Sequence, residues 1–239
     1  MGAAGVPMTP FYDHAGITVY CGDCRDVLPT LADKSVDHVI TDPPYSDVTH
    51  NGARTGDVTQ SLLRGAFDCI TADELRAIFA AAAPKRWTVA FADWRHVAQL
   101  ETAPPAGLDF IRFGVWIKPN GAPQFTGDRP ATGWEAVGIW HRSGEKKRWN
   151  RGGHPAVWTR NKENGPHPTT KPLGLVTDIV ASFTDPGDLI LDPFGGSGTT
   201  ARACKDLGRR CIVIERERKY CEVIVRRLRQ EVLAIGGAA

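Results

Sequence analysis

Short apolar runs recur along the chain, and several are separated by longer segments whose apolar residues have helical spacing. Runs that are rich in β-branched residues and closed by an acidic or turn residue are typical of strands. Seven such runs predict strands at 17–20, 36–40, 88–92, 110–117, 136–140, 189–191 and 211–214. Helical spacing predicts helices at 72–83, 173–183, 199–207 and 219–233.

Strands that alternate with helices favour an α/β fold, with one mostly parallel sheet of seven strands and helices on both of its faces. The chain has no internal repeat or linker, so we expect a single domain over residues 1–239. Two stretches, 46–69 and 120–165, follow neither period and are rich in glycine and charged residues. Because long irregular loops in compact domains are usually functional or disordered, 120–165 is a candidate recognition insertion.

Composition narrows the class of protein. Lys and Arg number 29 against 27 Asp and Glu, so attraction to a polyanion requires a local basic patch. No apolar run is long enough to span a membrane and the first residues do not resemble a signal peptide, which predicts a cytoplasmic protein. Six cysteines without framework spacing favour reduced thiols. Cys21 and Cys24 lack the second pair that a zinc site needs, so we expect no metal.

A glycine-rich turn separates the strand predicted at 189–191 from the helix predicted at 199–207. It consists of Asp192, Pro193, Phe194, Gly195, Gly196, Ser197, Gly198 and Thr199. Glycines let a backbone approach a ligand closely, and a helix start offers unpaired N–H groups to an anionic group. Glu215 closes the next predicted strand, where doubly wound folds place a carboxylate for ribose hydroxyls. These features predict a cofactor site; an ordinary tight turn with a surface glutamate is the alternative.

The tetrapeptide Asp42-Pro43-Pro44-Tyr45 closes the strand predicted at 36–40. Two prolines fix the backbone and remove two N–H donors, which leaves the Asp42 carboxylate and the Pro43 carbonyl as acceptors. Acceptors beside an aromatic ring suit a planar amine. The alternative is a strand-ending turn with an exposed tyrosine.

Together with the segment His167-Pro168-Thr169-Thr170-Lys171-Pro172, these motifs resemble those of the S-adenosylmethionine-dependent DNA amino-methyltransferases. Their order, with the tetrapeptide first and the glycine-rich turn last, is similar to that of the family's β class. The resemblance extends over residues 16–233. It implies a Rossmann-like methyltransferase fold with circularly permuted motifs, S-adenosylmethionine as cofactor, double-stranded DNA as partner and a homodimer.

The resemblance also implies residue roles. The turn from Asp192 to Thr199 would hold the methionine part of the cofactor, and Glu215 its ribose. Asp23, with Cys24 beside it, matches a position near the cofactor's adenine. Thr169, Thr170 and Lys171 would lie near its carboxylate, although Lys171 could also be a solvated residue at a helix start. The segment 94–96 would line the pocket, unless its tryptophan is simply packed in the core.

The chemistry implied for Asp42, Pro43, Pro44 and Tyr45 is the activation of a base amine. Two accepted N–H bonds would hold the nitrogen toward tetrahedral geometry, so that its lone pair can meet the methyl donor. The base must first leave the duplex, and Tyr45 would stack on it. Aspartate at the first position favours adenine N6 over cytosine N4, because family members that act on the cytosine amine usually carry serine there.

A basic segment is the candidate for DNA contact. Residues 142–162 hold seven Lys and Arg against one Glu, interleaved with aromatic side chains. Such a loop suits phosphate contact, and we expect Lys146, Lys147, Arg148 and Arg151 to bind DNA. A solvated surface loop is the alternative.

Other functions are less compatible with the motifs. Methylation of RNA or of a protein glutamine would use a similar pocket. The glutamine methyltransferases, however, carry Asn-Pro-Pro-Tyr and place the cofactor turn first. A non-catalytic DNA-binding module is disfavoured by the intact acceptor and glycine motifs.

Overall fold

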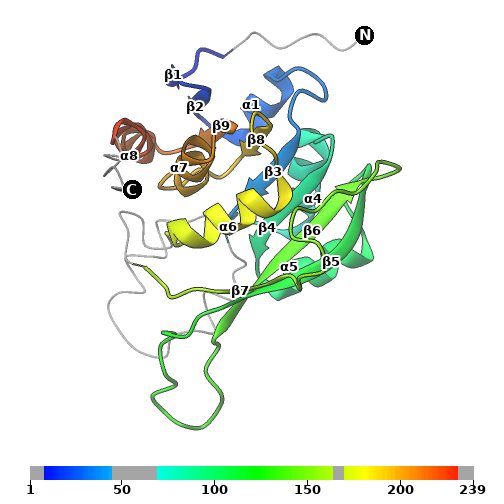
Figure 1. Ribbon diagram of the computed structural model, residues 1–239, viewed down its shortest axis with the longest axis vertical. Helices are drawn as coiled ribbons and strands as arrows, with labels where there is room; N and C mark the ends of the chain where they lie inside the picture. Colours follow the sequence, from blue (N-terminus) through cyan, green and yellow to red (C-terminus); the bar gives the residue numbers. More distant parts are fainter. Residues whose placement is uncertain (1–7, 45–68, 164–169, 231–239) are drawn as a thin grey trace, which may run out of the picture.

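The computed structural model describes residues 8–44, 69–163 and 170–230, and the structural statements below concern these residues. They form a nine-stranded sheet in the order β1-β2-β9-β8-β3-β4-β6-β5-β7, with helices in front of it and behind it (Figure 1). The α/β prediction is confirmed, but the predicted number of strands is too low by two. The additional strands are the edge strands β1 (Tyr12–His14) and β7 (Val157–Thr159). Three residues are too few to display a strand period.

The centre of the sheet is parallel, as predicted. It comprises β2 (Ile17–Cys21), β9 (Arg210–Glu215), β8 (Leu189–Asp192), β3 (His38–Thr41) and β4 (Trp87–Ala92). β6 (Trp134–Arg142) is antiparallel to both β4 and β5 (Leu108–Ile117), and β7 is parallel to β5. Every residue of β3 and β4 is buried, since helices cover both faces, and this explains their continuous apolar runs.

Four helices match the predicted ones within a few residues. They are α4 (Ala72–Ala82), α6 (Leu173–Phe183), α7 (Thr199–Asp206) and α8 (Arg218–Arg229). The structure adds α1 (Cys24–Val27), the 3₁₀ turn η1 (Leu28–Thr30) and α5 (Trp94–Thr102). A reciprocal capping box between Thr71 and Glu74 starts α4, because it satisfies N–H groups that have no partner inside the helix.

Two apolar clusters lie on the two faces of the sheet. Ile179 of α6 and Ile224 of α8 belong to one, and Phe79 of α4, Leu100 of α5 and Trp140 of β6 belong to the other. All five side chains are almost fully buried. The sheet is therefore packed between two apolar layers of side chains.

The carboxyl ends of the parallel strands meet at one edge of the sheet, which we call the carboxyl edge. β3, β8 and β9 end there at Thr41, Asp192 and Glu215. The loop from β5 to β6 begins at the same edge, whereas β6 ends at the opposite, amino edge (Figure 1). Ligands of doubly wound sheets bind at the carboxyl edge. None of the described helices is both long and apolar enough to cross a membrane.

Candidate active site

The tetrapeptide and the glycine-rich turn are neighbours at the carboxyl edge, because β3 and β8 pair directly. The hydroxyl of Thr41 donates a hydrogen bond of 2.6 Å to Oδ1 of Asp192, and the backbone N–H of Phe194 donates to the same oxygen at 3.1 Å. Asp192 is 2% exposed. Its carboxylate therefore ties the turn to the end of β3, and its expected contact with a cofactor stays a prediction.

A cavity of about 420 Å³ opens beside this junction. Its volume lies in the range typical of small-molecule sites. It is lined by most of the predicted site residues: Asp23, Cys24, Asp42, Pro43, Pro44, Lys171, Phe194, Gly196 and Glu215. A smaller adjoining space of about 60 Å³ is lined by Thr170, Asp192, Gly195, Ser197 and Thr199, and it shares Asp42 and Lys171 with the cavity. Tyr45 and Thr169 lie outside the described residues.

Positions 196 and 198 of the turn require glycine for different reasons. Gly196 has a φ of +51°, and a Cβ built on it would meet no atom within 4 Å. Since Gly196 lines the cavity, its backbone leaves that wall open to a ligand. Gly198 has a φ of +78°, and a Cβ there would lie 2.8 Å from Cγ1 of Ile224. Gly198 therefore allows the close packing of α8, and it lines neither the cavity nor the smaller space beside it.

Glu215 faces the cavity from the end of β9. Its Oε2 accepts a 2.7 Å hydrogen bond from the N–H of Gly196, and its Oε1 accepts one of 2.7 Å from the N–H of Glu217. Burial raises the pKa of the Glu215 carboxyl. Each oxygen keeps a second lone pair, so the carboxylate can still accept hydrogen bonds from ligand hydroxyls.

Asp23 and Cys24 line the cavity at the start of α1. Asp23 caps this helix and accepts hydrogen bonds from the N–H of Arg25 at 2.8 Å and from its guanidinium at 2.6 Å. Hydrogen bonding from the Arg25 side chain lowers the pKa of Asp23 to about 2. Burial raises the pKa of Cys24 to about 11, which favours the neutral thiol near pH 7.

The side chain of Lys171 contacts the first residue of the tetrapeptide, Asp42. Its side chain is 7% exposed, and its Nζ is 2.5 Å from Oδ2 of Asp42 and 3.5 Å from Oε2 of Glu135. The interpretation as a solvated residue is therefore wrong. Lys171 forms an ion pair with Asp42 and lines both cavities, and its expected position near a cofactor carboxylate stays a prediction. Sequence reasoning overlooked Glu135, since it belongs to no motif.

Asp42 is poised as an acceptor. Burial raises the pKa of its carboxyl to about 6, with the Lys171 ammonium opposing that rise, so Asp42 is ionised at neutral pH. Its Oδ1 is buried and accepts no hydrogen bond from the described residues. A buried acceptor without a donor is costly and rare in folded proteins. Oδ1 thus offers a hydrogen-bonding position to a ligand in the cavity that Asp42 lines.

Arg227 of α8 braces the start of α7, and no motif had indicated it. Its guanidinium donates to the carbonyl oxygen of Ser197 at 2.8 Å, to Oγ of Ser197 at 3.1 Å and to Oγ1 of Thr199 at 3.2 Å. Oγ1 of Thr170 lies 3.3 Å from Oγ of Ser197. The predicted residues Thr170, Ser197 and Thr199 are therefore brought together, and their hydroxyls line the smaller space.

Four apolar or aromatic lining residues were also missed by sequence reasoning: Ile70, Ile78, Ile214 and Tyr220. Ile78 lies on the buried face of α4 and has the spacing of a core residue, so no local signal separates it from its neighbours. The segment 94–96 begins α5 and lines neither cavity. Trp94 is 52% exposed with the guanidinium of Arg95 over its ring, so it is not packed in the core either.

The basic segment and Asp42 lie at opposite edges of the sheet. Lys146, Lys147 and Arg148 follow the end of β6 and line a groove at the amino edge, together with Lys85 and Arg86. The six residues of β4 separate the two edges by about 20 Å. The side chains of Lys146, Lys147 and Arg148 therefore lie at the edge of the sheet opposite the cavity, and their expected contact with DNA stays a prediction.

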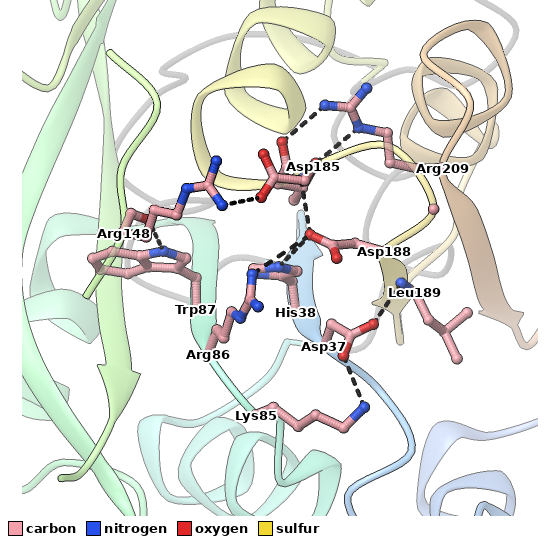
Figure 2. A network of polar contacts seen from close by, with 12 residues as sticks. Asp37, His38, Lys85, Arg86, Trp87, Arg148, Asp185, Asp188, Leu189 and Arg209 are labelled. Carbon is pink, nitrogen blue, oxygen red and sulfur yellow. Dashed lines mark hydrogen bonds and ion pairs between the residues drawn. The ribbon is translucent and has the colours of Figure 1, made fainter. Parts of the chain in front are cut away.

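Arg148 has a structural role at the amino edge (Figure 2). Its guanidinium lies 3.0 Å from the Asp185 carboxylate, and its carbonyl oxygen accepts a 2.7 Å hydrogen bond from the indole of Trp87. Beside it, His38 Nε2 lies 3.1 Å from Oδ2 of Asp188. Arg151, in the same loop, is half-buried. These contacts fasten the loop after β6 to the start of the central strands.

Comparisons with known proteins agree with this geometry. A family model for N6/N4-type DNA methylases matches residues 36–226, from the start of the first motif strand into α8. The chain belongs to this family, and the predicted class, a DNA amino-methyltransferase with an α/β methyltransferase fold, is confirmed.

Individual relatives match nearly the whole chain. The Type II methyltransferase M2.MboI of Moraxella bovis is 30% identical, over 90% of this chain and 88% of its own. The Type II methyltransferase M2.DpnII of Streptococcus pneumoniae is 29% identical, over 95% of each chain. A crystal structure of the M1.HpyAVI–SAM complex superposes with a TM-score of 0.69 at 26% identity, and covers 88% of this chain and 99% of its own.

Proposed function

We propose that this chain transfers a methyl group from S-adenosylmethionine to the N6 amino group of adenine in double-stranded DNA. The observation that carries the proposal is the buried Oδ1 of Asp42, an acceptor without a described donor that lines the same cavity as Gly196 and Glu215. An acceptor poised beside a cofactor-sized cavity is what the activation of an amine requires.

The cavity residues fit the cofactor. Glu215 has lone pairs for ribose hydroxyls, Gly196 leaves the wall open, and Phe194 offers an aromatic surface. The apolar side chains Ile70 and Ile78 suit a flat ring system at the α4 side of the cavity. S-adenosylmethionine supplies the methyl group when it is bound. That M1.HpyAVI was crystallised as a SAM complex supports this assignment.

The chain's own residues act on the amine. Oδ1 of Asp42 and the carbonyl oxygen of Pro43 accept its two N–H bonds, and this holds the nitrogen toward tetrahedral geometry with its lone pair directed into the cavity. Lys171 keeps Asp42 ionised and occupies Oδ2, so that Oδ1 remains for the substrate. The work is positioning and electrostatics, with no covalent intermediate on the protein. Pro44 lines the cavity beside these two acceptors. The role proposed for Tyr45 is to stack on the flipped base.

The loop 118–133 between β5 and β6 suits DNA recognition, because it extends from the carboxyl edge (Figure 1). Phe125 within it is 88% exposed, and Trp94 is exposed near the same edge. Exposed aromatic side chains beside a base-flipping site can enter a groove or replace a displaced base. The first part of the insertion 120–165 therefore contacts the duplex at the active site, and Lys146 and Lys147 contact a different stretch of DNA backbone.

We also propose that the protein is a cytoplasmic homodimer and a single methyltransferase domain. The resemblance to the β class supports the dimer. Exposed apolar side chains on β5 and on the edge strand β7, namely Phe113, Ile117 and Val157, supply surface of the kind that subunit contacts bury.

The decisive experiment is nucleoside mass spectrometry of duplex DNA incubated with the protein and S-adenosylmethionine. N6-methyladenine is the expected product, and the Asp42→Ala variant serves as the control. Adenine rests on aspartate at the first position of the tetrapeptide. N4-methylcytosine as the sole product would overturn the choice of base but not the mechanism, and methylation of RNA alone would overturn the substrate class.

A further inference from the structure

Four charged side chains of alternating sign contact one another in a row that ends at the tetrapeptide: Lys118, Glu135, Lys171 and Asp42. They come from four segments, namely the residue after β5, the start of β6, the loop before α6 and the residue after β3. Lys118 donates a hydrogen bond to Oε1 of Glu135, whose Oε2 lies 3.5 Å from Nζ of Lys171. Lys171 in turn donates to Oδ2 of Asp42 at 2.5 Å.

Three of the four charged side chains are largely buried, so the pairing of their charges affects the energy of the site. The side chains of Lys118, Glu135 and Lys171 are 12%, 20% and 7% exposed. Buried charges are costly unless each is paired with good geometry. The two inner charges, Glu135 and Lys171, each have a partner of opposite sign on both sides. Glu135 is the link, because it is the member that contacts both lysines.

We propose that Glu135 is a positioning residue for methyl transfer: braced by Lys118, its carboxylate holds the Lys171 ammonium on Oδ2 of Asp42, which turns Oδ1 toward the target amine. This inference rests on the proposed function of Asp42. A carboxylate rotates readily about its Cβ–Cγ bond, and a donor fixed on one oxygen restricts that rotation. Without the Glu135 carboxylate, the Lys171 ammonium loses one of the two carboxylates that it contacts, and the ring of Phe91 at 5.1 Å offers no charge in its place.

The charges that face Asp42 give the proposal a second readout. They are Lys171 from the loop before α6, Glu135 from β6 and Asp192 from β8. The ammonium lowers the pKa of Asp42, and the two carboxylates raise it. An ionised Asp42 is the stronger hydrogen-bond acceptor and the partner of the Lys171 ammonium, so kcat of the native protein should fall below about pH 6. Removing the negative charge of Glu135 should move this acid limb to lower pH.

The test is steady-state methylation of duplex DNA by the full chain between pH 5 and 9. Glu135→Gln should lower the plateau kcat about 10- to 100-fold, since small displacements of a positioned group have effects of this size. Its acid limb should move to lower pH, while calorimetry shows unchanged S-adenosylmethionine affinity. Glu101→Gln, the same change at an exposed position of α5, is the matched control and should behave as the native protein.

A second variant acts on the other side of Glu135. Lys118→Met removes the ammonium that braces Glu135 and that lies 4.8 Å from the centroid of the Trp116 ring, so Glu135 draws Lys171 away from Asp42 and the acid limb moves to higher pH. Opposite shifts in the two variants support the proposal, because a general loss of folding does not produce them. If the native protein methylates DNA and both variants match Glu101→Gln, Glu135 has no positioning role. If the native protein itself does not methylate DNA, the proposed function fails instead.

Discussion

The two carboxylate oxygens of Asp42 differ in their hydrogen bonding, and the proposed mechanism depends on this difference. Oδ2 is occupied by Lys171, and Oδ1 has no donor among the described residues. A surface aspartate would be hydrated at both oxygens and hold neither in place. Burial at the end of β3 thus turns an ordinary side chain into a directional acceptor, at the cost of a raised pKa.

The substitution Asp42→Ala tests this role directly. Turnover should fall by a factor on the order of 10²–10³, the usual cost of losing one positioned hydrogen-bonding group. Binding of S-adenosylmethionine should change little, because Glu215 and Gly196 remain. Single-turnover methylation and calorimetry measure the two effects separately. Full methyl transfer by this variant would remove Asp42 from the mechanism.

Gly196→Val should abolish binding of S-adenosylmethionine without unfolding the chain. The new side chain would project into the open space beside Gly196, where a Cβ meets no protein atom within 4 Å. A β-branched residue at φ +51° also strains the backbone, by roughly 1–2 kcal/mol.

Gly152→Val is the matched control for this strain. Gly152 has a φ of +55°, has equally open space around it and lies in the loop after β6. Calorimetry should therefore find binding lost in the first variant and retained in the second. Equal affinity in both variants would argue against the glycine-rich turn as the cofactor site.

Different functional features lie at the two edges of the sheet. The carboxyl edge holds the cavity and the exposed aromatic residues, whereas the amino edge holds a basic groove and the polar network around Asp188 (Figure 2). In that network Asp37 accepts a 2.9 Å hydrogen bond from the N–H of Leu189 and a 2.8 Å bond from Lys85. These contacts join β3, β4 and β8 at their starts, so that their ends are held in place at the site.

Replacing Lys146 and Lys147 by Ala tests the basic groove without disturbing this network. If both side chains contact phosphates, DNA affinity should weaken and the slope of log K against log salt should fall by up to about 1.8, or 0.9 for each contact. The single-turnover rate at saturating DNA should stay unchanged, since the groove is at the amino edge. Arg148 is left intact because its ion pair with Asp185 is structural. An unchanged slope would assign DNA binding to the carboxyl edge alone.

Assembly is a property of the molecule as a whole. The β5–β7 edge exposes Phe113, Ile117 and Val157 by 50%, 41% and 43%, and the pairing of Val115 with Val157 brings the two strands together there. Sedimentation equilibrium should give about twice the chain mass of 26.0 kDa. Phe113→Asp should weaken the dimer if this edge is buried between subunits. A monomer at all concentrations would contradict the proposed homodimer.

Local pattern was sufficient for most of the fold. The apolar runs of β3, β4 and β9 and the helical spacing of α4 and α6 are set by near neighbours, so they can be recognised without any tertiary knowledge. The turn after β8 and the tetrapeptide after β3 were also predictable as one site, because the ends of parallel strands meet at one edge of a sheet. Family resemblance then predicted the chemistry.

The contacts that give the site its properties depended on the order of the strands. The ion pair between Lys171 and Asp42 joins positions 129 residues apart, and the proximity of Glu135 requires β6 to lie beside β4. The sequence likewise did not indicate at which edge of the sheet the basic segment lies, and the antiparallel direction of β6 carries it to the amino edge. Charge is visible in a sequence, whereas the side of the sheet on which a charge emerges is set by chain direction and pairing.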